Sequence, residues 1–136
     1  MGQQQLLLLV MGIVIVGVAI LAGYAASEIS FKQHDADALI NRCLSIAQEA
    51  VFWKAKTDPF EGGNASYAGL TEGGFDRLFI GDQTEGGEFK IITATSDSLV
   101  IIAVSKRFPD VGVRVSVAGE EIVDTDIDYN GGITLD

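Results

Sequence analysis

The chain has 136 residues and a formal net charge of −10, which leaves room for one small globular domain after a strongly apolar start. Its 9 lysines and arginines are scattered, so the basic footprint of a nucleic-acid-binding protein is absent. The single cysteine, Cys43, excludes an intramolecular disulfide and a cysteine-based zinc site.

The first 27 residues carry no charged side chain, and Leu6–Gly23 form an unbroken apolar run of 18 residues. A helix of this length spans about one hydrocarbon thickness of a bilayer. The run is longer than the apolar stretch of about 7–15 residues in a signal peptide, and no lysine or arginine precedes it. We therefore expect the segment to stay on the mature protein, as a membrane anchor or as the packed core of an assembly.

Small residues favour the packed core. Ala19 with Gly23, and Ala22 with Ala26, are pairs of the small-xxx-small type, which let helix backbones approach closely. A simpler interpretation is that glycine and alanine are common in any membrane span. The predicted assembly residues are Leu6, Leu7, Leu9, Ile13, Gly17, Ala19, Ile20 and Gly23.

The helix is predicted to continue far beyond this segment, because no helix breaker occurs before Asp58-Pro59. Apolar residues recur at spacings of three, four and seven, as in an amphipathic helix: Ile29, Ala36, Ile40, Cys43, Ala47, Ala50 and Val51. We predict one helix from about Gln3 to about Thr57, apolar over residues 1–27 and amphipathic over 28–57. His34 is expected on its exposed face, so no histidine-dependent triad and no enzyme is predicted.

Residues 58–87 are rich in glycine and are predicted to be a connecting loop. Their glycines lack the spacing of a phosphate-binding motif. Asn64-Ala65-Ser66 is a glycosylation sequon, which makes Asn64 a candidate modification site.

The pattern of residues 88–136 indicates a β-sheet. Tight turns at Ser96-Asp97 and Gly119-Glu120 favour an antiparallel meander. Residues 99–104 are apolar at every position, so one face of the sheet meets the helix and the other needs cover from the glycine-rich stretch or from a neighbouring copy. The expected fold is α+β, with strands near Glu88–Thr95, Ser98–Ser105, Val111–Ala118 and Glu121–Asp128.

The acidic C-terminus contains the one motif with metal chemistry. Residues 126–131 read D-x-D-x-N-G, the opening of a calcium loop, with Ile133 at a position that is usually apolar. Alternatively, these carboxylates form only an acidic, solvent-exposed face of the last strand. The candidate calcium ligands are Asp126, Asp128 and Asn130, with Asp124 and Asp136 as supplementary donors.

A long helix with an apolar first half, followed by a small β domain, resembles the type IV pilin-like family, which includes pilins, pseudopilins and archaeal pilins. The short start ending in Gly2, followed by Gln3-Gln4-Gln5 and the apolar run, is similar to a prepilin-type N-terminus. It differs in having no basic leader, and cleavage after Gly2 would put Leu7 where such pilins usually carry a glutamate.

The resemblance implies the structural subunit of an extracellular filament on the cell surface. The subunit's partners would be copies of itself, and it would wait in the inner or cytoplasmic membrane before assembly. Pseudopilins use calcium near their C-terminal end, which adds to the calcium prediction. The alternative function is a single-span, membrane-anchored binding domain at the cell surface.

Overall fold

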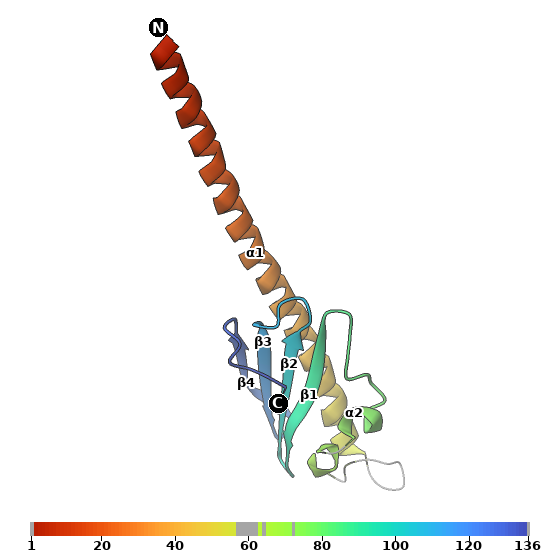
Figure 1. The fold of residues 1–136 in the computed structure, drawn as a ribbon. Coiled ribbons are helices and arrows are strands. Elements are labelled where there is room, and N and C mark those ends of the chain that lie inside the picture. The colour runs from red at the N-terminus through yellow and green to blue at the C-terminus, as the bar shows by residue number, and fades with distance from the viewer. Residues whose placement is uncertain (1, 57–62, 64, 72, 136) are drawn as a thin grey trace. The chain divides into compact units, whose positions relative to one another are not determined.

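The computed structural model describes residues 2–56, 63, 65–71 and 73–135 (Figure 1). It confirms the predicted α+β fold of one long N-terminal helix and a four-stranded antiparallel sheet. The chain divides into two units, Met1–Gln33 and His34–Asp136. The elements are α1 (Gly2–Ala55), η1 (Ala68–Leu70), α2 (Gly74–Arg77), β1 (Gly87–Ala94), β2 (Ser98–Ser105), β3 (Gly112–Ala118) and β4 (Glu121–Asp128).

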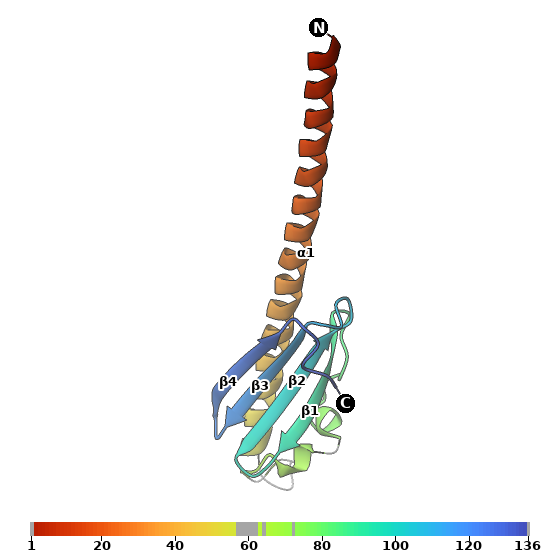
Figure 2. The same cartoon turned by 60° about the vertical axis from the view of Figure 1, so that its left-hand side comes forward.

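The strands follow one another in the sheet in chain order, as expected of a meander (Figure 2). The bounds of β2 and β4 are those predicted. The strand β1 begins and ends one residue earlier than predicted, and β3 begins one residue later. Gly119 has a φ of 64°, which a glycine adopts without a steric penalty and which a tight hairpin turn requires here. Turn chemistry and alternation therefore predicted the strands and their order, whereas the register shifts between Ile91 and Thr93 and between Ser116 and Val117 were not predicted.

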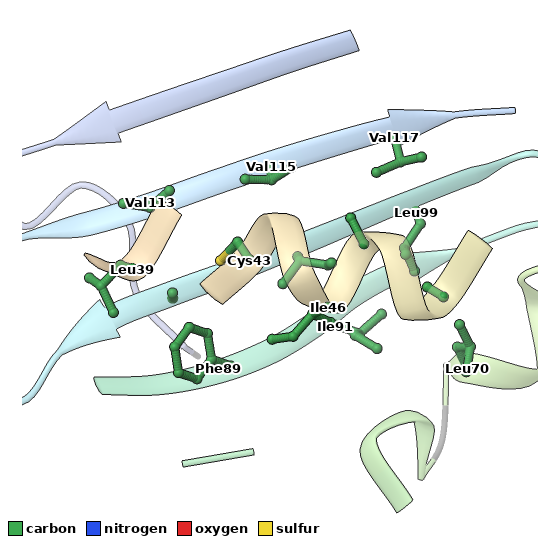
Figure 3. Packing of buried hydrophobic residues seen from close by; sticks show 14 of the residues in the cluster. Leu39, Cys43, Ile46, Leu70, Phe89, Ile91, Leu99, Val113, Val115 and Val117 are labelled. Atoms are coloured by element: carbon green, nitrogen blue, oxygen red, sulfur yellow. The ribbon is translucent and has the colours of Figure 1, made fainter. Parts of the chain in front are cut away.

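The second half of α1 packs on one face of the sheet (Figure 3). Predicted helix positions such as Ala36, Cys43 and Ala47 are buried there, whereas Ile29 is exposed. Burial raises the pKa of the Cys43 thiol to about 12, so it stays protonated and unreactive in the folded chain. The sheet contributes Phe89, Ile91, Leu99, Ile101, Ala103, Val113, Val115 and Val117 to the same core.

Tyr67 links the connection between helix and sheet to the β1–β2 and β3–β4 turns. Its backbone N–H donates to the carbonyl of Thr95, beside the β1–β2 turn. Its hydroxyl donates to the carbonyl of Gly119 in the β3–β4 turn, at an O···O distance of 2.5 Å. Burial, with a smaller contribution from the charge of Glu120, raises the pKa of the Tyr67 hydroxyl. The fully buried ring thus ties three separate segments together at one end of the sheet.

The predicted connecting loop is partly ordered into short helices, because η1 and α2 both fall within residues 58–87. Of this stretch, residues 58–62, 64 and 72 lie outside the described residues. Leu70, Gly74 and Leu78 are buried and close one end of the core. The glycine content had led to the prediction of an irregular loop, and the two short helices were not predicted.

The outer face of the sheet is covered in part by the C-terminal segment, a third possibility beside the two that the sequence suggested (Figure 2). Ile133 is only 4% exposed, and a Cβ at Gly112 on β3 would lie 2.7 Å from its side chain. The Nζ of Lys90 on β1 donates to the carbonyl of Leu135 at 2.8 Å. The segment therefore crosses from β4 to β1 over the outer face of the sheet.

Candidate assembly surface

Every residue from Gly2 to Ser27 is exposed in the single chain. This stretch lies in α1, within the first unit, and the predicted assembly residues all belong to it. Large apolar side chains such as Leu7 and Ile13 are each more than half exposed. Apolar groups on all sides of a helix are favourable only when lipid or other protein surrounds them.

Small residues leave shallow recesses, called notches below, on more than one side of this segment. Gly12, Ala19, Gly23 and Ala26 are separated by seven, four and three residues, which places them on one helix face. The first of these notches is a shallow apolar hollow formed with Leu8, Leu9, Ile13 and Val16.

Gly17 lies on a different face, because five residues of α-helix correspond to a rotation of about 140° from Gly12. A Cβ added at Gly17 meets no atom of the chain within 4 Å. The segment thus allows close approach of other helices from at least two directions.

The described residues contain one helix, α1, that is long and apolar enough to cross a membrane by length and composition. An N-terminal signal sequence meets the same criterion. By length and composition the segment is therefore a membrane anchor or a signal sequence. The notches are a further property that neither role requires.

The acidic residues of β4 lie on the outer face of the sheet. Asp124 pairs with Ser116 and Asp126 pairs with Arg114 on β3, so these side chains share the face opposite the helix. Along an extended strand, residues two apart are separated by roughly 7 Å. Among the described residues, no group of three or more His, Cys, Asp or Glu side chains is placed so that it could hold a metal ion.

Asp128, the last residue of β4, organises the turn that follows. Its Oδ1 accepts a hydrogen bond from the backbone N–H of Asn130 at 3.1 Å, and its Oδ2 accepts one from the N–H of Gly132. Gly131 in turn donates to the backbone carbonyl of Asp110 at 2.9 Å. The motif that suggested a calcium loop therefore forms a turn in which the Asp128 carboxylate accepts hydrogen bonds from the backbone N–H groups of Asn130 and Gly132.

Calcium binding stays a prediction, with Asp126, Asp128 and Asn130 as ligands. Asp124 lies on the same strand as the first two, whereas Asp136 lies outside the described residues. Asn64 of the glycosylation sequon is also outside the described residues. His34 is exposed, as predicted.

We expect millimolar calcium to raise the unfolding temperature of the full chain in detergent, because a cation relieves repulsion among clustered carboxylates. Asp128→Ala also removes the two hydrogen bonds that the Asp128 carboxylate accepts from backbone N–H groups, so the quantity to compare is the calcium-dependent shift of the unfolding temperature rather than stability itself. Asp126→Asn provides the matched variant, because no hydrogen bond of its carboxylate would be lost within the turn. Calorimetry that finds equal shifts in wild type, Asp128→Ala and Asp126→Asn would assign these residues to a solvated acidic face.

Comparisons with known proteins found no match to this chain among family models, curated proteins or solved structures.

Proposed function

We propose that this chain is the structural subunit of an extracellular, type IV pilus-like filament. The observation that carries the proposal is the segment 2–27, in which every side chain is apolar or uncharged and all are exposed in the single chain. In the filament, copies of this segment would pack together as the core. The sheet unit, with its net acidic surface, would form the outside.

Before assembly the same segment would hold the subunit in the membrane, because its length matches the hydrocarbon thickness. By composition alone, an apolar helix is equally stable when surrounded by lipid and when surrounded by neighbouring helices. Close packing additionally needs small residues, and the notches at Gly12 and Gly17 supply these on two faces. A lone anchor does not require them.

Electron microscopy of the full-length protein, purified and transferred out of detergent, tests the proposal. A filament subunit forms long polymers of uniform diameter. A membrane-anchored surface domain, the alternative function, gives monomers in detergent and single-span proteins in vesicles. Dispersed monomers under all these conditions would favour the alternative.

The N-terminus of the mature protein provides an independent prediction. Since the filament core needs the apolar run Leu6–Gly23, the mature protein should retain this run, whether or not Met1-Gly2 is removed as a leader. Intact-mass spectrometry distinguishes these forms. A mature chain that begins at Ala25, Ala26 or Ser27 would identify a cleaved signal peptide and remove the proposed core.

A further inference from the structure

Phe79 is an apolar side chain in an unusual position. Its ring is 85% exposed, and its φ of 57° places it in the left-handed region, where glycine is normally found. It follows α2 in a helix-ending motif, in which the N–H of Ile80 donates to Phe75 and that of Phe79 donates to Asp76, both at 3.1 Å. A phenylalanine here strains the backbone and exposes an apolar ring.

The neighbouring apolar residues of this turn do not share its exposure. Leu78 is buried, and Phe75 and Ile80 are half-buried against the core. The phenyl ring of Phe79 thus adds nothing to the core of its own chain. An exposed aromatic side chain on a well-anchored turn is typical of a residue that inserts into a partner.

A small apolar hollow lies at the other edge of the same unit, between the second half of α1 and the edge strand β4. Ala47, Val51, Val117 and Ile122 supply its apolar lining, and Gln48 and Glu120 complete it. Its volume of about 160 Å³ is below the roughly 300–1,000 Å³ of small-molecule sites and suits a single side chain. Ile122 remains 45% exposed in it because the helix does not cover β4.

The elements that carry the two features, α2 and β4, lie at opposite sides of the sheet (Figure 1). The helix α2 adjoins β1, since a Cβ at Gly74 would lie 2.9 Å from the side chain of Ile91. The hollow adjoins β4, which is three strands away in the sheet order. One chain therefore cannot fill its own hollow with its own Phe79. A contact that joins one edge of a copy to the opposite edge of the next is head-to-tail, so it repeats from copy to copy and builds an open polymer unless its rotation closes a ring.

Charge agrees with this pairing. Arg77, two residues before Phe79, is exposed. The adjacent residue of α2, Asp76, is also exposed. The hollow is lined by Glu120, and residues 120–136 contain no lysine or arginine. Arg77 of one copy would thus approach an edge on the next whose charged side chains are all acidic, while the adjacent Asp76 carries the same charge as Glu120, so Arg77 supplies the one favourable charge contact of this orientation.

We propose that Phe79 of one copy inserts into the hollow between α1 and β4 of a second copy, with Arg77 facing Glu120. The contact would join the outer units of neighbouring subunits. The inference rests on the proposed filament as the setting in which copies lie side by side, but it concerns a surface separate from the apolar segment.

Cysteine cross-linking of the full-length protein tests the contact. Phe79→Cys combined with Ile122→Cys should give, under mild oxidation, a ladder of covalent dimers, trimers and longer species on a non-reducing gel. Each single variant should stay monomeric, and a mixture of the two single variants should give dimers and nothing longer. The buried thiol of Cys43 is unreactive in the fold, so the wild type is the background control.

Phe79→Gly is a second variant that keeps the turn, because glycine adopts a positive φ without strain. It should unfold at the same or a higher temperature and yet raise the concentration needed for assembly by roughly tenfold or more. A dimer from Phe79→Cys alone would show a symmetric contact and overturn the proposal. Filaments without a ladder from the double variant would overturn it and leave the proposed core standing, as expected if the ring instead enters a membrane. If the double variant forms no filaments and gives no ladder, both proposals are contradicted.

Discussion

Gly17→Phe is expected to abolish filaments while the sheet unit stays folded and the chain stays in the membrane. A Cβ at Gly17 meets no atom within 4 Å, so the larger side chain has room in the single subunit. Phenylalanine is apolar, so membrane insertion is unaffected. In a packed core, however, the ring would hold neighbouring backbones apart and remove close contacts along the segment. Electron microscopy with circular dichroism of the same sample measures both effects.

Two variants make this test specific. Ala19→Phe, on another face of the segment, should have the same effect, since several neighbours surround each helix in a bundle. Gly17→Ala keeps a small side chain and should still form filaments. If both phenylalanine variants polymerise like the wild type, the apolar segment is not a packed core, and the membrane-anchored surface domain becomes the better interpretation.

The elements of the fold were predictable from the sequence because their signals are local. The absence of a helix breaker before Pro59 predicted α1, which ends at Ala55. Alternation of Val111, Val113, Val115 and Val117 with small or polar residues predicted β3. Tight turns then left the meander as the simplest topology.

Contacts between distant segments were not predictable in this way. Tyr67 bonds to Gly119, 52 residues away, and no spacing rule connects a loop tyrosine with a hairpin turn. Trp53 was outside the predicted helix face but is buried, because residues after the helix return over it: a Cβ at Gly63 would lie 2.6 Å from its ring. Such closures depend on the tertiary arrangement rather than on periodicity.

The candidate sites likewise divide into those that a local sequence pattern predicted and those that depend on the tertiary arrangement. The assembly residues were identified from composition alone, because an all-round apolar helix is a one-dimensional signal. The hollow between α1 and β4 was invisible, since it exists only because the helix leaves one strand of four uncovered. The sequence did contain an indication for Phe79, which the sequence analysis did not use. The turn Arg77-Leu78-Phe79-Ile80 has no glycine at the position after the helix where a glycine with positive φ is common.

The role of Ile133 leads to a second large expected effect. The sequence placed it at the apolar position of a calcium loop, whereas the structure buries it on the outer face of the sheet against Gly112. Ile133→Ala should therefore cost about 2–4 kcal/mol of unfolding free energy with or without calcium, since it removes apolar burial and leaves a cavity. The unfolding temperature should fall by roughly 10–20 °C, measured by near-ultraviolet circular dichroism of the full chain in detergent.

Ile127→Ala is the matched control for this prediction. Ile127 has the same side chain, lies on the neighbouring strand β4 and is 36% exposed, against 4% for Ile133. Its truncation should cost less than about 1 kcal/mol, because a side chain that is already partly in water loses little burial. A chelator should leave the difference between the two variants unchanged. Equal, small effects would mean that the C-terminal segment does not hold the outer face; a difference that vanishes on chelation would instead assign Ile133 to a metal-dependent loop.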